Sequence, residues 1–99
     1  MAAAVIALAP KAVADLERLR KFLVETDPAA AEQTVTLILS AIAVIEHHPL
    51  IGRPVEKGLH ELVISRGKSG YVALYRYDEA RDRALVLTIR HRLETGYGG

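Results

Sequence analysis

The sequence GYVALYRYDEARDRALVLTIRHR, residues 70–92, decides the fold. It predicts two β-strands, Tyr71 to Tyr77 and Arg83 to Arg90, because both runs are rich in β-branched, aromatic and aliphatic residues. The polar segment Asp78 to Asp82 suits a hairpin connection between them. Ala84 to Ile89 is apolar at nearly every position, which predicts a central strand with both faces covered. Charge returns where this strand ends, so we expect any functional site near that end.

Upstream, the periodicity predicts a strand and then a helical hairpin. Ala3 to Leu8 is a short apolar run, and the segment Pro10 to Glu25 carries apolar residues at helical spacing. Asp27 is the expected N-cap of a second helix, which runs from Pro28 to about His47. Because the connection is short, we expect the two helices to be antiparallel. The apolar stripe of the first helix consists of Val13, Leu16, Leu19 and Leu23.

The next segment, Leu50 to Gly58, contains two glycines and a proline and is predicted to be a loop. We expect its Leu50 and Ile51 to lie under the helices. A further strand, Leu59 to Ile64, completes the order βααβββ. The chain is therefore expected to be a single α+β domain spanning residues 1–99. Its sheet is predicted to be four-stranded and mainly antiparallel, with the helical hairpin packed on one face.

The composition limits the possible functions. With 99 residues, 51% of them hydrophobic, the chain has room for one ordinary globular core. Cysteine is absent, which excludes disulfides and thiolate chemistry. The net charge is only +1, so any phosphate binding must be local. No apolar run approaches the roughly 20 residues that span a bilayer, so we expect a soluble protein without a membrane partner.

Several basic and titratable residues come from two strand ends and the tail. They are Arg66, Lys68, Arg90, His91, Arg92 and Tyr97. Arginine binds phosphate through two hydrogen bonds, and histidine and tyrosine transfer protons, so these types could form a phosphodiester-cleaving site. The alternative is a solvated sheet edge capped by long cations. Arg90 and His91 are strand neighbours and should point to opposite faces, so both can serve one site only if the strand has ended or bulged there.

The remaining motifs indicate structure rather than chemistry. Tyr71, Tyr75 and Tyr77 share one face of their strand, which is typical of a core. His47 and His48 are adjacent on a helix, point about 100° apart and lack a carboxylate motif, so we expect no metal site. The sequence contains no glycine-rich phosphate loop and no HExxH motif, and we expect no cofactor.

Four phrases, in this order on a chain of this length, resemble the RelE/ParE superfamily of bacterial toxins. They are HPLIGRPV (His48 to Val55), HELVI (His60 to Ile64), SGYVALYRYD (Ser69 to Asp78) and VLTIRHRLETGY (Val86 to Tyr97). The resemblance implies the toxin half of a type II toxin–antitoxin module. It also implies a cytoplasmic protein that a cognate antitoxin holds inactive.

The superfamily contains ribosome-dependent messenger-RNA endonucleases, which are RelE-like, and inhibitors of DNA gyrase, which are ParE-like. Arg66, His91 and Tyr97 match functional positions of the endonucleases and would be catalytic if this chain cuts RNA on the ribosome. The near-neutral charge and the phrases HPLIGRPV and HELVI favour the ParE-like branch. We therefore expect gyrase as the target, bound through Arg66, Arg90, His91 and Tyr97. A third hypothesis is a non-toxic module that only binds an antitoxin.

An antitoxin of this kind is expected to contribute an amphipathic segment that folds on the toxin, on the helical hairpin or at a sheet edge. The expected contacts are Leu19, Phe22 and Leu23, because Phe22 adds apolar area beside the stripe of the first helix.

Overall fold

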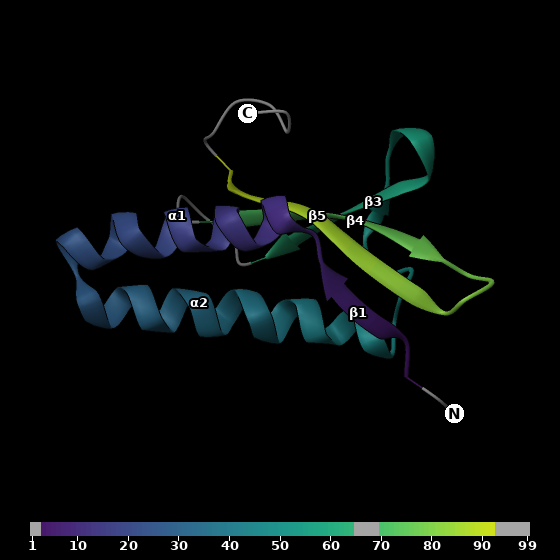
Figure 1. The fold of residues 1–99 in the computed structure, drawn as a ribbon, viewed down its shortest axis with the longest axis horizontal. Helices are drawn as coiled ribbons and strands as arrows, with labels where there is room; N and C mark the ends of the chain where they lie inside the picture. The colour runs from purple at the N-terminus through teal and green to yellow at the C-terminus, as the bar shows by residue number, and fades with distance from the viewer. Residues whose placement is uncertain (1–2, 65–69, 93–99) are drawn as a thin grey trace.

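A computed structural model describes residues 3–64 and 70–92 of the chain. Figure 1 shows two layers, a helical hairpin and a twisted sheet. The helices are α1 (Pro10–Thr26) and α2 (Pro28–Ala43), and the short 3-10 turns η1 (Val44–Glu46) and η2 (Glu56–Gly58) follow. The strands are β1 (Val5–Leu8), β2 (Arg53–Pro54), β3 (Leu59–Ile64), β4 (Tyr71–Asp78) and β5 (Arg83–His91). The predicted α+β class, with an antiparallel helical hairpin on one face, is confirmed.

The sheet has the strand order β1-β5-β4-β3-β2. β5 pairs with β4 in the antiparallel sense and with β1 in the parallel sense, so it is a central strand as predicted. We expected a four-stranded sheet, and the described residues form five strands. Arg53 and Pro54 pair with Glu61 and His60 and make the two-residue edge strand β2, which is too short to show a strand pattern in the sequence.

The two faces of β5 differ in burial. Ala84, Val86 and Ile89 face the helical hairpin and are fully buried. On the opposite face, which we call the outer face, Leu85 is 39% exposed. The prediction that both faces of this strand are covered is therefore wrong at Leu85. An apolar residue on a half-exposed strand face produces the same local pattern as a buried one.

Three tyrosines of β4 lie on the core side of the sheet, as predicted. Tyr71 and Tyr75 are buried, and Tyr77 packs against the same core. The Tyr75 hydroxyl donates a hydrogen bond to the Pro49 carbonyl at 2.7 Å and accepts one from the Gly52 N–H at 2.9 Å. This hydroxyl therefore holds the backbone of the loop after η1.

The side chains of that loop do not lie under the helices. Leu50 is 62% exposed and Ile51 is 51% exposed, so the expectation for both was wrong. The physical reason is that the loop is fixed by the hydrogen bonds of its backbone to Tyr75. Those bonds satisfy buried polar groups of the backbone, and they do not require the neighbouring side chains to be buried.

The helix boundaries follow the expected signals with one difference. Asp27 caps α2, because its carboxylate accepts a hydrogen bond from the Ala30 N–H at 3.3 Å. α2 ends at Ala43, and the 3-10 turn η1 continues it, so the α-helix is shorter than predicted. Contrary to expectation, the segment Pro28–Glu46 is by length and composition apolar enough to cross a membrane. The core helix of a soluble protein passes the same test, and Ile38 and Ile42 of α2 are in the core.

Candidate functional site

The carboxyl end of β5 holds two of the predicted site residues. Arg90 pairs with Val72 of β4, and His91 pairs with Tyr71. The His91 ring meets the Tyr71 ring edge-on, with the ring centres 5.3 Å apart. Because Tyr71 belongs to the core and strand neighbours alternate, His91 lies on the core side of the sheet and Arg90 on the outer face.

The sheet contains a register shift, but it lies between Leu74 and Tyr75 of β4, where Leu87 of β5 has no partner on β4. The pairs at Arg90 and His91 are regular, so the bulge does not bring these two side chains to one face. Arg90 turns back on the strand end and donates to the carbonyls of His91 and Arg92, both at 3.3 Å. Arg66 and Tyr97, the other two predicted site residues, lie outside the described residues.

The helical hairpin exposes apolar side chains to solvent. The three expected antitoxin contacts, Leu19, Phe22 and Leu23, differ in how exposed they are. Phe22 is 69% exposed, and Leu23 is half-buried. Leu19 is only 6% exposed and belongs to the core, so this residue supports the fold and offers a partner little surface. The exposed large apolar residues of α1, α2 and η1 are Val13, Phe22, Val24, Leu37, Leu39 and Val44.

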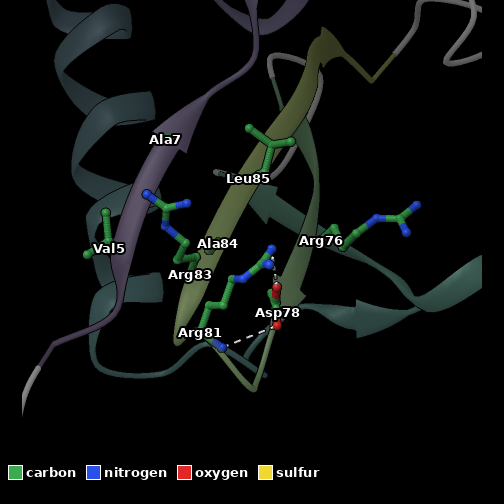
Figure 2. Close-up of a pocket in the computed structure, with 8 residues that line it drawn as sticks. All are labelled: Val5, Ala7, Arg76, Asp78, Arg81, Arg83, Ala84 and Leu85. Atoms are coloured by element: carbon green, nitrogen blue, oxygen red, sulfur yellow. Dashed lines mark hydrogen bonds and ion pairs between the residues drawn. The ribbon is translucent and has the colours of Figure 1, made fainter.

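A groove of about 300 Å³ lies on the outer face, at the end of the sheet away from Arg90. We call it the outer-face groove. It is lined by Val5, Ala7, Arg76, Asp78, Arg81, Arg83, Ala84 and Leu85. In Figure 2, Arg83 reaches across β1, Arg81 bends toward Asp78, and Arg76 projects from the opposite flank away from both.

The strand register explains why these residues meet. Val5 of β1 pairs with Arg83 of β5, which pairs with Asp78 of β4. These residues form one row across three strands. The next row on the same face is formed by Ala7, Leu85 and Arg76. The two rows thus place the apolar side chains of Val5 and Ala7 on the β1 side of the groove and the charged side chains of Asp78 and Arg76 on the β4 side.

The charges in the groove are unequally paired. Arg81 forms an ion pair with Asp78, with 3.7 Å between the guanidinium nitrogen and the carboxylate oxygen. Within residues 3–64 and 70–92, the side chains of Arg76 and Arg83 make no hydrogen bond or ion pair. An anion that enters the groove therefore meets the Arg83 guanidinium, which no described side chain neutralises, while the Arg76 guanidinium points away from the groove.

Two tyrosine hydroxyls have shifted acidity. The hydrogen bond to Asp82, together with burial and the nearby negative charges, raises the pKa of Tyr77 to about 12. Burial raises the pKa of Tyr75 against the smaller opposing effect of its hydrogen bond with Gly52. Both hydroxyls stay protonated at neutral pH and donate hydrogen bonds, so neither acts as a general base. In the described part of the chain, no group of three histidine or acidic side chains could hold a metal ion.

The outer-face groove was not predicted from the sequence. The signal that could have found its sides is the alternation of Arg76 with Tyr75 and Tyr77, and of Arg83 and Leu85 with Ala84 and Val86. This alternation assigns Arg76, Arg83 and Leu85 to the face opposite the core. It does not say that β1 is the neighbour of β5.

Comparison with known proteins adds a family match. A family model described as the ParE toxin of the type II toxin–antitoxin system parDE matches residues 6–96. A curated protein called Toxin RelE3, from Caulobacter vibrioides, is 37% identical over 89 residues. That alignment covers 90% of this chain and 95% of the relative.

Solved structures share the fold. A chain of the chromosomal ParDE system from P. aeruginosa superimposes with a TM-score of 0.75 at 23% identity, covering 89% of this chain and 95% of that one. A chain of the RelBE2 toxin–antitoxin complex from Mycobacterium tuberculosis gives a TM-score of 0.59 at 23% identity, covering 91% and 99%. The E. coli toxin RelE, as a mutant in the free state, gives 0.64 at 13% identity, covering 92% and 85%.

Proposed function

The chain belongs to the ParE family of toxins of type II toxin–antitoxin systems, within the RelE/ParE superfamily, and from this premise we propose that it arrests bacterial growth by binding and inhibiting DNA gyrase. A cognate antitoxin holds it inactive in the cytoplasm. The antitoxin part of the proposal is supported by the RelBE2 structure, in which a toxin of the same fold is part of a toxin–antitoxin complex.

One observation carries the choice of gyrase over RNA cleavage. Arg90 and His91 lie on opposite faces of the sheet, with the His91 ring packed against Tyr71. A cleavage site needs a phosphate-binding cation and a proton-transferring group within reach of the same scissile bond. Arg90 and His91 do not form such a pair, whereas a binding surface that wraps around a strand end can use both faces. The cation of the alternative site is Arg66, which lies outside the described residues.

The alternative is a ribosome-dependent messenger-RNA endonuclease. It is favoured by the name of the relative that is 37% identical, Toxin RelE3. In this case Arg66, His91 and Tyr97 would form the catalytic site. The low net charge of +1 counts against a protein that works among ribosomal phosphates.

The deciding experiment measures the purified toxin against two targets. The first assay is DNA supercoiling by gyrase, and the second is cleavage of messenger RNA on programmed ribosomes. We expect inhibition of supercoiling and intact messenger RNA. Cleaved messenger RNA with normal supercoiling would assign the protein to the endonucleases and contradict the proposal.

Variants of His91 separate binding from catalysis. His91→Phe keeps an aromatic ring against Tyr71 but removes the imidazole, and His48→Ala is the matched control at an exposed histidine elsewhere. An acid–base mechanism would lose about 10²- to 10⁴-fold in cleavage rate in His91→Phe. A binding mechanism predicts a smaller loss of gyrase inhibition, and an equal or greater loss for a chain that ends at Arg92.

Expression of the toxin without its antitoxin tests whether it is toxic at all. Growth arrest with filamentation and DNA-damage signalling is expected for a gyrase inhibitor. Rapid loss of translation is the outcome expected of the endonuclease. Normal growth, with the protein folded and abundant, would leave only the module that binds an antitoxin without toxicity.

A further inference from the structure

We propose that the outer-face groove binds an extended segment of the cognate antitoxin that carries a single carboxylate. One carboxylate of the segment pairs with Arg83, and an adjacent apolar side chain packs against Val5, Ala7 and Leu85. The inference rests on the proposed function only in requiring a cognate antitoxin. It does not depend on whether the toxin acts on gyrase or on the ribosome.

The shape of the groove fits a short stretch of peptide. Its volume is about 300 Å³, which is enough for one or two side chains. Val5 is 58% exposed and forms the β1 flank, and Leu85 is exposed beside it on β5. Covering these side chains removes apolar surface from water, which favours an occupant with an apolar residue next to its charge.

The charges of the groove select a carboxylate. Arg83 has no side-chain hydrogen bond or ion pair within the described residues, and its guanidinium lies over β1 at the open side of the groove. Arg81 is already engaged with Asp78. Arg76 stands on the far flank and, having no described side-chain partner, can rotate inward. A guanidinium pairs with a carboxylate through two parallel hydrogen bonds, which gives both affinity and orientation.

The surroundings of the groove disfavour nucleic acid. The β4–β5 turn beside it carries the acidic residues Asp78, Glu79 and Asp82. A nucleic-acid strand brings a series of phosphates, and those beyond the first would approach these carboxylates. A peptide brings a single charge to Arg83 and passes the turn with uncharged residues, so its electrostatic repulsion is smaller.

The position of the groove favours the antitoxin as the source of the peptide. β1 touches η1, where the Ala4 N–H donates to the Glu46 carbonyl at 2.9 Å. The exposed Val44 of η1 and the exposed Val5 of β1 therefore lie on neighbouring elements. A segment that covers the apolar surface of the helical hairpin can continue around the β1 edge into the groove. Segments that fold on binding commonly wrap large surfaces in this way.

The experiment measures the affinity of full-length toxin for full-length cognate antitoxin by calorimetry. The variants are Arg83→Gln and the double variant Arg76→Gln with Arg83→Gln. Arg53→Gln is the matched control, because Arg53 is an exposed arginine at the other edge of the sheet that pairs with Glu61. We expect affinity to fall about 10- to 100-fold in the double variant, less in the single variant and not in the control. The loss should shrink at high salt.

A second variant tests the groove without removing an arginine. Ala7→Glu places a carboxylate in the row of Leu85 and Arg76, where it competes with the incoming one. We expect a similar loss of antitoxin affinity with an unchanged melting temperature. Unchanged affinity in the double variant and in Ala7→Glu, with both proteins folded, would overturn the proposal.

Two further outcomes would assign the groove to another partner. Loss of gyrase inhibition in Arg83→Gln, with antitoxin affinity intact, would show that the groove binds gyrase and not the antitoxin. Loss of binding to a single-stranded RNA probe, with antitoxin affinity intact, would give it to nucleic acid. If wild-type toxin does not inhibit gyrase, the proposed function fails while the antitoxin measurements still decide this inference.

Discussion

The Asp15 carboxylate on α1 accepts a hydrogen bond from the backbone N–H of Ile89 on β5, at 3.0 Å. β1 pairs with β5 only as far as Val86, so within residues 3–64 and 70–92 no strand lies beside this edge of β5 beyond that point. α1 takes the place of the strand there, and Asp15 satisfies the N–H that β1 does not reach. Lys11 in turn donates to this buried carboxylate at 2.9 Å.

Replacing Asp15 should therefore destabilise the protein. We expect Asp15→Ala to lower the free energy of unfolding by about 1–3 kcal/mol, because it leaves the buried N–H of Ile89 without an acceptor. Asp15→Asn retains an acceptor and loses only the ion pairs with Lys11 and Arg18, so its cost should be smaller. Chemical denaturation of both variants measures the difference. Equal losses would show that the ion pairs, not the bond to Ile89, stabilise the fold.

Gly52 should not tolerate a side chain. A Cβ at this position would lie 2.8 Å from Cε1 and 2.9 Å from the hydroxyl oxygen of the buried Tyr75. We expect Gly52→Ala to cost about 1–3 kcal/mol, since the tyrosine cannot move without disturbing the core. Gly58→Ala is the comparison, because a Cβ there meets open space but sits at a φ of +74°. Gly58→Asn should be less destabilising than Gly58→Ala, because asparagine tolerates a positive φ. Gly52→Asn should be more destabilising than Gly52→Ala, because its side chain is larger.

The raised pKa of Tyr77 predicts that the free energy of unfolding falls at alkaline pH. Its hydroxyl donates to Asp82 at 2.6 Å, and this bond raises its pKa from 10.0 to about 12. The stabilisation is present in full below pH 10, the unfolded value, and is lost as the pH rises through about 12. The difference in unfolding free energy between wild type and Tyr77→Phe should shrink over that range. A difference that stays constant with pH would contradict the assigned bond.

Two residues of α1 should separate folding from antitoxin binding. Phe22→Ala is expected to weaken antitoxin binding by about tenfold or more and to leave stability almost unchanged, because the ring is exposed. Leu19→Ala should lower the free energy of unfolding by about 2–5 kcal/mol, since it empties a core position. Lys21→Ala, an exposed polar neighbour, is the control. Unchanged affinity in Phe22→Ala would place the antitoxin elsewhere.

Local signals were enough to predict most of the elements. Asp27 was expected to start α2, and the apolar run Ala84 to Ile89 was expected to be a central strand. The structure confirms both, since β5 has a paired strand on each side. Each of these inferences depends on residues that are close in the sequence. A capping side chain and a run of strand formers act within a few positions, so the sequence displays them directly.

Features that depend on distant partners could not be predicted in the same way. β2 exists because Arg53 and Pro54 meet β3, and nothing in two residues indicates a strand. The outer-face groove exists because Val5 lies next to Arg83, almost the whole chain away. Arg90 and His91 were correctly expected to alternate, but the site they would share with Arg66 and Tyr97 stays a prediction.

The strand order β1-β5-β4-β3-β2 has a consequence for synthesis on the ribosome. β1 is made first, yet its strand partner β5 is the last strand of the described chain to be made. Until residues 83–91 have left the exit tunnel, β1 has no strand to pair with and α1 has no Ile89 N–H to bind. A nascent chain that stops before this point lacks the strand that joins β1 to β4. The chain can therefore complete its sheet only after β5 has left the ribosome, and fragments that stop earlier should not fold.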